Sequence, residues 1–169
     1  MKKKILVILG SDVHDFSRLT LFLEQFLLDF NSNYDFTFQL GYTKHLPLNG
    51  ICRDFFSHAE LIELISESDA IVAHGGAGVF NMCASLGKMP ILVPRLVKLG
   101  EHRDTSQPFF CERLEDLNLC LYLKELSSPR LIDAINYVHK RSIIFDDEEY
   151  ALNLMSAVSA QLNEWGFDV

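Results

Sequence analysis

Several marks of common functional classes are missing from this sequence. Basic residues are scarce: the 169 residues carry a formal net charge of −8, and the only basic run is residues 2–4. Phosphate neutralisation dominates affinity for nucleic acids, so a nucleic-acid partner is not expected. The four cysteines form no C-x-x-C pair, which argues against a zinc site. We interpret them as buried free thiols in a reducing compartment.

A membrane-spanning segment is missing as well. The most apolar stretch, residues 19–28, is too short to cross a bilayer and is interrupted by polar residues. The apolar run after the N-terminal lysines ends at Gly10, and no small-residue cleavage site of a signal peptide follows. With 49% hydrophobic and 22% charged residues, we expect one cytoplasmic globular domain over residues 1–169.

What the sequence does contain is a regular alternation of strand-like and helix-like segments. Short aliphatic runs such as residues 5–9 predict parallel strands that are covered on both faces. The expected strands are residues 5–9, 36–40, 51–53, 70–73, 91–93 and 119–123, and the expected helices are residues 16–30, 57–68, 78–86, 105–117, 128–140 and 147–165. This order predicts an α/β fold, a three-layer Rossmann-like domain with a parallel sheet.

The ends of several predicted helices carry local signals. Asp15 stands where the N-cap of the first helix is expected. Ser57 and Glu60 have the S-x-x-E spacing of a capping box. Gly87 suits a left-handed residue after a helix, and Ser128 precedes a proline as an N-cap would.

The stretch that organises the chain is the glycine-rich turn His74-Gly75-Gly76-Ala77-Gly78. It lies where a predicted parallel strand ends and a helix begins, at the sheet edge where ligands collect. Glycines there let a ligand approach the backbone, and the free N–H groups of a helix start attract phosphate. The spacing differs from a G-x-G-x-x-G fingerprint and from a Walker motif. Two interpretations stay open: a phosphate cradle, and a tight turn that needs small residues for packing.

Six short motifs occur in order along the chain. They are Gly10-Ser11, Phe16-Ser17-Arg18-Leu19, Gln39-Leu40-Gly41-Tyr42, residues 74–78, residues 86–95, and Gly100-Glu101-His102 with Gln107. Together they resemble the C-terminal domain of family 28 glycosyltransferases. They are most similar to the small soluble subunits of two-component transferases in bacterial capsule and exopolysaccharide synthesis. The soluble subunit of the eukaryotic GlcNAc transferase that makes dolichol-linked chitobiose is also similar.

This resemblance implies half of a GT-B enzyme. The soluble chain would supply the site for a UDP-sugar donor, and a separate membrane-associated partner subunit would supply the acceptor side. The implied reaction transfers a hexose or N-acetylhexosamine to a lipid-linked acceptor in polysaccharide biosynthesis, at the inner face of the membrane. Such transferases stabilise the leaving UDP with helix dipoles and side chains, without a metal or another cofactor. The lack of a D-x-D motif agrees with this.

The matching positions imply a role for each candidate residue. Backbone N–H groups of residues 75–78 would bind the diphosphate, and Gly10 and Ser11 would face the same crevice. Four residues further along would line the sugar and uridine side, and His74 would be a structural imidazole bonded to the backbone. The full set is Gly10, Ser11, His74, Gly75, Gly76, Ala77, Gly78, Arg95, Glu101, His102 and Gln107. The general base is expected from the partner subunit.

Three positions depart from the family pattern. Where relatives place Ser after the last glycine and Glu three residues later, this chain has Val79 and Met82. Ser106 stands where His is usual. Val and Met cannot bond phosphate or ribose hydroxyls, and a buried hydrogen bond to a charged group is worth ~1.5–3 kcal/mol. The alternative to an active subunit is therefore a non-catalytic module that stabilises or regulates a transferase complex, with a small-nucleotide sensor as a weaker third reading.

The predicted last helix, residues 147–165, carries one apolar stripe at helical spacing. Its members are Ala151, Leu154, Met155, Val158, Leu162 and Trp165. We favour packing of this stripe onto its own domain over docking to a partner subunit, which is the other interpretation.

Overall fold

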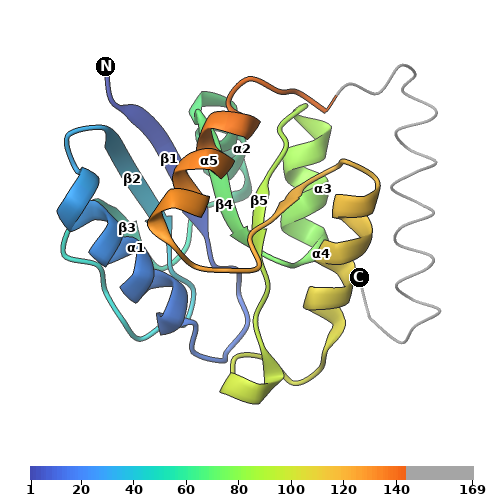
Figure 1. Cartoon of the computed structure of the whole chain (residues 1–169). Helices are drawn as coiled ribbons and strands as arrows, with labels where there is room; N and C mark the ends of the chain where they lie inside the picture. The colour runs from blue at the N-terminus through green and yellow to red at the C-terminus, as the bar shows by residue number, and fades with distance from the viewer. Residues whose placement is uncertain (144–169) are drawn as a thin grey trace.

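The computed structural model describes residues 1–143, which form a six-stranded sheet with helices between the strands (Figure 1). The strands are β1 (Lys3–Ile8), β2 (Tyr34–Gln39), β3 (Ile51–Arg53), β4 (Ala70–His74), β5 (Ile91–Val93) and β6 (Leu121–Tyr122). The helices are α1 (Ser17–Phe30), α2 (His58–Glu67), α3 (Ala77–Ser85), the 3-10 helix η1 (Val97–Leu99), α4 (Ser106–Asp116) and α5 (Ser128–Val138). The predicted last helix, residues 147–165, lies outside the described residues.

Every strand pairing in the sheet is parallel, in the order β3-β2-β1-β4-β5-β6. Within the central strand, Ile5 lies opposite Phe36 on one side and Ala70 on the other. The chain proceeds outward from β1 in one direction and from β4 in the other, so the strand order reverses between these two strands. Ligands of such sheets bind at the carboxyl ends of the strands beside that reversal. The predicted α/β, three-layer Rossmann-like parallel sheet is confirmed.

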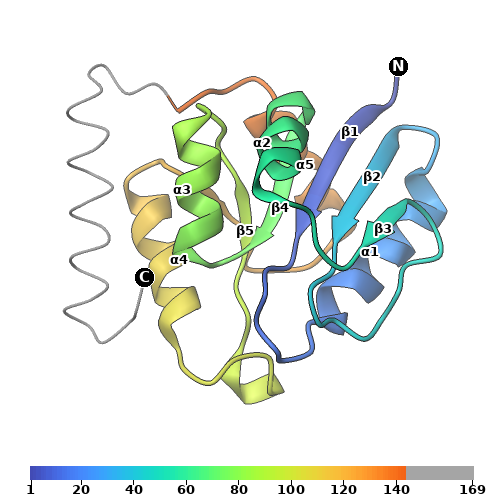
Figure 2. The same ribbon diagram turned by 180° about the vertical axis from the view of Figure 1, so that it is seen from behind.

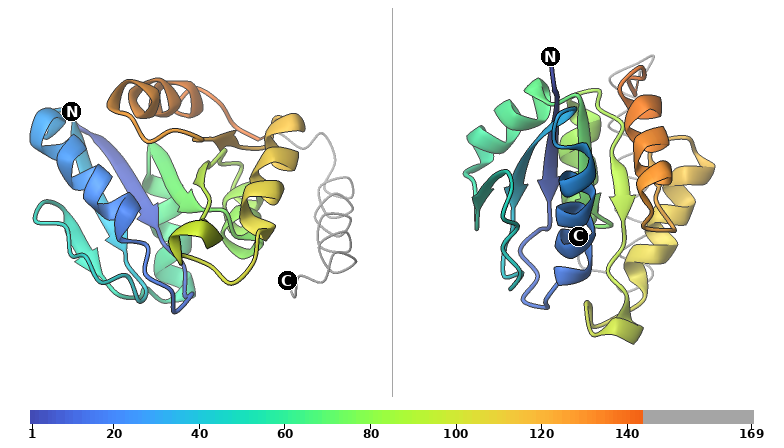
Figure 3. Two further views of the ribbon diagram at one scale, coloured as in Figure 1. Left: turned by 60° about the horizontal axis from the view of Figure 1, so that its bottom comes forward. Right: turned by 60° about the vertical axis from the view of Figure 1, so that its left-hand side comes forward.

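Helices cover both faces of the sheet. α1 and α5 lie on one face, α2 and α3 lie on the other, and α4 lies beside the edge strand β6 (Figures 1 and 2). Further views show the sheet between the helices (Figure 3). Residues 5–9 are each at most 3% exposed because helices pack against both faces of the central strand. Burial of each such aliphatic side chain stabilises the fold by ~1.5–3 kcal/mol.

The cysteines are free thiols. Cys83, Cys111 and Cys120 are buried, as predicted, whereas Cys52 is partly exposed. Burial raises the pKa of Cys83 to about 12, so this thiol stays protonated at neutral pH.

Two of the predicted helix signals are confirmed. Ser57 is the N-cap of α2: its hydroxyl accepts a hydrogen bond from the Glu60 N–H, and the Glu60 carboxylate accepts one from the Ser57 N–H. Gly87 follows α3 with a φ of +69°, the left-handed conformation expected after a helix.

Two other signals are wrong by one residue. Phe16, and not Asp15, is the N-cap of α1, although the Asp15 carboxylate accepts hydrogen bonds from the N–H and hydroxyl of Ser17. The last described helix, α5, begins at Ser128 with Ser127 as its N-cap. The proline therefore occupies the second helical position, where its missing N–H is equally harmless.

The edge strand β6 is shorter than predicted. Residues 119–123 were expected as a strand, and only Leu121–Tyr122 form one. This strand pairs with β5 alone, and β5 has three residues between Pro90 and Pro94. A proline donates no hydrogen bond to a ladder, so the flanking prolines limit how far the pairing extends.

Replacement of Ser57 by Ala should destabilise the fold by about 1 kcal/mol, because it removes the hydroxyl that satisfies an amide at the start of α2. Chemical denaturation followed by circular dichroism measures the loss. The matched control is Ser66→Ala, an exposed change on the same helix, which should alter the free energy of unfolding by less than about 0.5 kcal/mol. Equal stability of the two variants would contradict the capping role.

Candidate functional site

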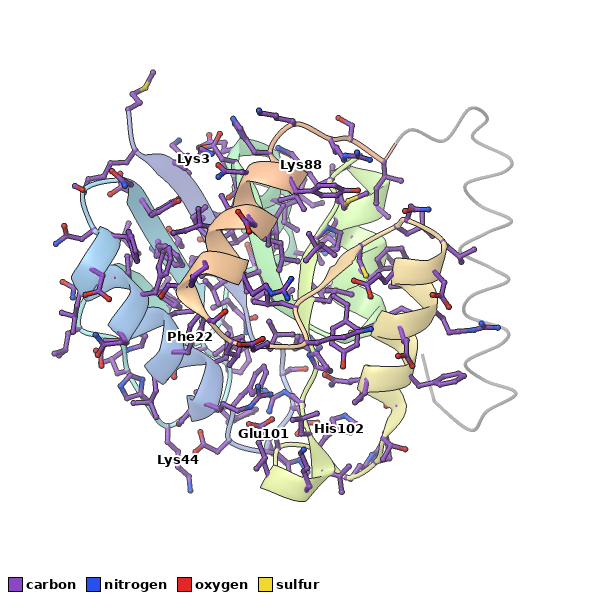
Figure 4. The ribbon with its side chains drawn as sticks, in the orientation of Figure 1. Lys3, Phe22, Lys44, Lys88, Glu101 and His102 are labelled. Carbon is purple, nitrogen blue, oxygen red and sulfur yellow. The ribbon has the colours of Figure 1, made fainter. Side chains whose placement is uncertain are left out.

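A cavity of about 650 Å³ opens at the carboxyl ends of the central strands. Its lining comes from the segments after β1, β3 and β4, from the start of α3 and from the segment that leads into α4. The cavity lies beside the reversal of strand order, and small-molecule sites have volumes of ~300–1,000 Å³. Figure 4 shows Glu101 and His102 near the carboxyl ends of the strands, far from Lys3 and Lys88 near their amino ends.

The glycine-rich turn is part of the cavity wall. β4 ends at His74, Gly76 is the N-cap of α3, and the helix begins at Ala77, one residue earlier than predicted. The Gly75 N–H donates to Gln107 Oε1 at 3.1 Å, and the Gly76 N–H donates to the His74 carbonyl at 2.9 Å. These two amides are therefore engaged within the protein.

The first N–H groups of α3 are the ones that can meet a ligand. The first hydrogen bond inside the helix joins the Phe80 N–H to the Gly76 carbonyl. The N–H groups of Ala77, Gly78 and Val79 have no partner within residues 1–143, and all three residues line the cavity. Of the four amides that the sequence assigned to a diphosphate, the structure leaves the last two available and adds that of Val79.

The three glycines of the turn serve different purposes. A Cβ on Gly75 would come within 2.6 Å of Cys111 Sγ, and one on Gly76 would collide with the His74 ring. A Cβ on Gly78 would meet no atom within 4 Å. Packing therefore requires the first two glycines, whereas the open space at Gly78 lets a ligand reach the backbone. The packing interpretation therefore applies to Gly75 and Gly76, whereas the phosphate cradle stays a prediction for Gly78 and its neighbours in α3.

His74 has a neutral ring. Part of the ring lines the cavity, but its Nδ1 is buried without a hydrogen-bond partner among the residues described. Burial, helped by the charge of Arg95, lowers the pKa of His74 to about 4. Gln107 opposes this lowering of the His74 pKa, but its Oε1 already accepts hydrogen bonds from two backbone amides. The predicted bond from the imidazole to the backbone is therefore wrong: the main-chain carbonyl of His74 makes the bond, with Gly76.

Gln107 lines the cavity and joins two of its segments. The side chain is 5% exposed, and its Oε1 accepts hydrogen bonds from the N–H groups of Gly75 and Arg95 at 3.1 and 3.0 Å. It thereby ties α4 to the glycine-rich turn and to the segment after β5. Its oxygen is used inside the protein, so its part in the site is to position the turn.

Arg95 and Glu101 lie behind the cavity wall. Arg95 is fully buried, and its guanidinium donates to the carbonyls of Leu9, His14 and Glu101. Glu101 is 4% exposed and accepts two hydrogen bonds from Arg18, of 2.7 and 2.9 Å. The prediction that these two side chains line the sugar and uridine side is wrong, because neither is part of the lining. A buried charge is costly unless the protein compensates it: here Glu101 pairs with Arg18, and Arg95 is held by main-chain carbonyls.

Two histidines and two carboxylates form a cluster, and three of its members, Asp12, His102 and Asp104, line the cavity. Asp12 Oδ1 lies 2.6 Å from His14 Nδ1, and Asp12 Oδ2 lies 3.3 Å from His102 Nε2. His102 Nδ1 lies 3.3 Å from Asp104 Oδ1. Burial alone would raise the pKa of Asp12, but hydrogen bonds from His14 and the charge of Arg95 hold it below its usual value. No group within residues 1–143 has the arrangement of a metal site.

Gly10 and Ser11 line the cavity at the end of β1. Gly10 has a φ of +80°, and the Gln39 side chain binds both its N–H and its carbonyl. The exposed Ser11 can turn its hydroxyl toward a ligand. Sequence reasoning missed Asp12 as a lining residue, although its place directly after this pair was an available signal.

One part of the lining, here called the apolar wall, consists of Phe55, Phe56, Leu61, Val79 and Met82. Val79 and Met82 lie one turn apart on α3, and Leu61 belongs to α2. The two phenylalanines lie between β3 and α2, and Phe55 is 48% exposed. Sequence reasoning missed both, although adjacent aromatic residues just past a strand end were a usable signal.

Replacement of His74 by Phe should remove part of the acid sensitivity of the fold. The folded-state pKa of about 4 lies below the ordinary value of 6.5, so the unfolded chain binds the proton first as the pH falls. The stability that the neutral ring contributes is present above the unfolded value. It is lost as the pH falls from 6.5 to 4, by up to about 3 kcal/mol.

Urea denaturation from pH 4 to neutrality measures this dependence. His58→Gln, a change at an exposed histidine, is the control and should keep the pH dependence of the unchanged protein. A slope for His74→Phe that equals the control's would show that His74 does not titrate on unfolding.

Comparisons with known proteins give a family and related folds for this chain. Residues 5–148 match the model of the glycosyltransferase family 28 C-terminal domain. A search of curated proteins gives no match. Among solved structures, the chain is similar to the glycotransferase of kitacinnamycin, with a TM-score of 0.62 and 18% identity. It is also similar to the glycosyltransferase SnogD from Streptomyces nogalater (0.60, 21%) and to MurG from Acinetobacter baumannii (0.56, 14%).

The chain spans only part of the structures that it matches. The three alignments cover 98%, 94% and 95% of this chain but 40%, 40% and 52% of the other chains. At these identities the likeness shows the fold, which is that of GT-B glycosyltransferase C-terminal domains. No helix within residues 1–143 is long and apolar enough to cross a membrane.

Proposed function

Because the chain belongs to the glycosyltransferase family 28 C-terminal domain family, we propose that its cavity binds the UDP-sugar donor of a glycosyl transfer. One observation carries this proposal: the N–H groups of Ala77, Gly78 and Val79 face a cavity of about 650 Å³ beside the reversal of strand order. Unpaired amides at a helix start carry a dipole charge of about +0.5 and bind phosphate.

The nucleobase and the sugar of the donor are both joined to the diphosphate, so the proposed position of the diphosphate limits where each can lie. The nucleobase would lie against the apolar wall, where Phe55 and Phe56 offer flat apolar faces. The transferred sugar would lie on the polar side of the cavity, near His102 and Asp104. Ser11, at the end of β1, would donate its hydroxyl hydrogen to a phosphate oxygen.

The proposed reaction moves the sugar from the diphosphate to an acceptor hydroxyl. The acceptor oxygen bonds to the anomeric carbon, the bond from that carbon to the diphosphate oxygen breaks, and UDP leaves with the electron pair. The α3 amides stabilise the charge that develops on UDP, because they are oriented before the reaction. We assign the base that takes the hydroxyl proton to the acceptor side. Asp12 and Asp104 are engaged with histidines, and His74, with a pKa of about 4, is too weak a base.

The acceptor side would belong to a second, membrane-associated subunit. This part of the proposal rests on the motifs of the chain, which resemble those of soluble subunits in two-component transferases. In this proposal the acceptor is lipid-linked, and the transferred sugar is a hexose or an N-acetylhexosamine. The reaction would take place at the inner face of the membrane and contribute to polysaccharide biosynthesis.

A second function has the support of Val79 and Met82. Both line the cavity where the family pattern has Ser and Glu, so two polar contacts to a nucleotide are missing. In this alternative the chain is a non-catalytic nucleotide-sugar module that stabilises or regulates a transferase complex. Sugar transfer by the chain together with its partner subunit distinguishes the two functions.

Replacement of Gly78 by Leu should weaken UDP binding by more than about tenfold, because the new side chain would fill the space in front of the α3 amides. The position is open, and leucine favours a helix more than glycine, so the fold should be at least as stable. Isothermal titration calorimetry of the purified chain with UDP and several UDP-sugars measures the affinities.

Ser85→Leu, an exposed change at the other end of the same helix, is the matched control and should bind UDP as the unchanged chain does. Absence of binding to UDP and every UDP-sugar at millimolar concentration, with the partner subunit present, would refute the donor site. Binding without sugar transfer by the reconstituted pair would favour the non-catalytic module.

A further inference from the structure

His102 lies near the carboxyl ends of the strands and lines the cavity (Figure 4). A histidine changes its charge between about pH 5 and pH 8. The other histidine of the described lining, His74, stays neutral in most of this range, because burial lowers its pKa to about 4. Burial would raise the pKa values of Asp12 and Asp104, but hydrogen bonds hold both below the ordinary value. Among the described lining residues, His102 is therefore the one whose charge can respond to pH near neutrality.

The ring of His102 has hydrogen-bond partners in either protonation state. In the neutral form, its Nε2–H faces Asp12 Oδ2 at 3.3 Å, and its Nδ1 accepts the N–H of Asp104 at 3.2 Å. In the charged form, its Nδ1–H faces the carbonyl of Asp104 at 3.2 Å and the carboxylate of the same residue at 3.3 Å. A proton can therefore enter this cluster without leaving a polar atom of the ring unpaired.

The charged and titratable groups around His102 come from three parts of the chain. They are Asp12 and His14 after β1, His74 at the end of β4, and Arg95, Glu101, Arg103 and Asp104 after β5. Glu101 is paired with Arg18, and arginines stay charged. With His102 neutral, the described lining carries two carboxylates and one guanidinium, that of Arg103, whose side chain is 78% exposed. A proton on His102 cancels this excess of negative charge.

The cluster also lies within electrostatic range of the helix start. A Cβ on Gly76, the N-cap of α3, would collide with the ring of His74, so this ring packs against the turn that opens the helix. The charges of Asp12 and His102 both act on the pKa of His74. A diphosphate at the α3 amides would place further negative charge in the same cavity. Nearby negative charge favours the charged form of a histidine.

We infer that the chain takes up a proton at His102 when it binds its anionic donor, an inference that rests on the proposed donor site. The coupling is reciprocal, so a proton on His102 strengthens donor binding by the same factor. A nearby opposite charge favours the charged form of an ionisable group by about tenfold or more. The dissociation constant of the donor should therefore fall by about fivefold or more from pH 8 to pH 6, with an uptake of about half a proton near neutral pH.

Calorimetric titration of the full chain with UDP-glucose and UDP-N-acetylglucosamine from pH 6 to pH 8 tests the inference. Both phosphates of these ligands are esterified on two sides, so the ligands keep their charge in this range. UDP is unsuitable as the probe, because its terminal phosphate titrates there. Repetition near neutral pH in Hepes and in Tris, which differ in their enthalpy of ionisation, measures the number of protons taken up on binding.

His102→Gln keeps a polar side chain that does not titrate. In this variant binding should persist at the strength seen at pH 8, and both the fall in the dissociation constant and the proton uptake should disappear. The matched control is His14→Gln, which removes the other histidine bonded to Asp12, one that does not line the cavity. It should keep most of the proton uptake of the unchanged chain.

Binding by the unchanged chain without proton uptake would overturn the inference, as would the same uptake in a folded His102→Gln variant. Loss of the uptake in His14→Gln alone would overturn the place given to His102. If His102→Gln does not fold, the uptake in the unchanged chain and in His14→Gln decides. Failure of the proposed function looks different, because then neither UDP-sugar binds at any pH.

Discussion

A single buried cation, the guanidinium of Arg95, fixes the two sides of the cavity relative to each other. It donates to the carbonyl of Leu9 after β1 and to that of Glu101 before α4. Removal of an ion from water costs several kcal/mol unless the protein compensates it. Burial lowers the pKa of Arg95 and the carboxylates of Asp12 and Glu101 oppose this, while the Phe16 ring lies 4.7 Å from the guanidinium carbon. An arginine stays charged under these conditions, so the loops are held before any ligand arrives.

This constraint extends to the turn that faces the ligand. Glu101 binds Arg18 of α1, and Gln107 of α4 binds the backbone of Gly75 and Arg95. The polar side chains around the cavity are therefore mostly structural, since they satisfy one another or the main chain. Contact with the proposed charged ligand is left to the amides at the start of α3, and the hydrogen bonds of the turn orient these amides before a ligand binds. The fold places these amides, and the polar network keeps them there.

The sequence predicts what depends on local patterns. The aliphatic run of residues 5–9 and the S-x-x-E spacing at Ser57 each decide a local structure, and both agree with the fold. The site was predicted less well, because side-chain direction depends on contacts far apart in the chain. Arg95 follows a strand end, as a ligand-binding residue would, yet its guanidinium points inward to a carbonyl 86 residues away in sequence. Likewise, the Gly75 N–H, which was expected to bind a diphosphate, donates to the side chain of Gln107, 32 residues further along the chain.

The division between backbone and side-chain contacts explains how the chain can depart from its family and keep a site. A substitution removes a side chain but not a backbone amide, so the amides that we propose for phosphate binding persist whatever stands at position 79 or 82. Such substitutions change only the side-chain contacts that the proposed ligand would make through its nucleoside. The two kinds of contact meet at Val79, whose amide belongs to the helix start and whose side chain belongs to the apolar wall. If the proposed donor site is right, changes on that wall would therefore alter which nucleoside is accepted, while the helix-start charge proposed to hold the diphosphate stays as the fold sets it.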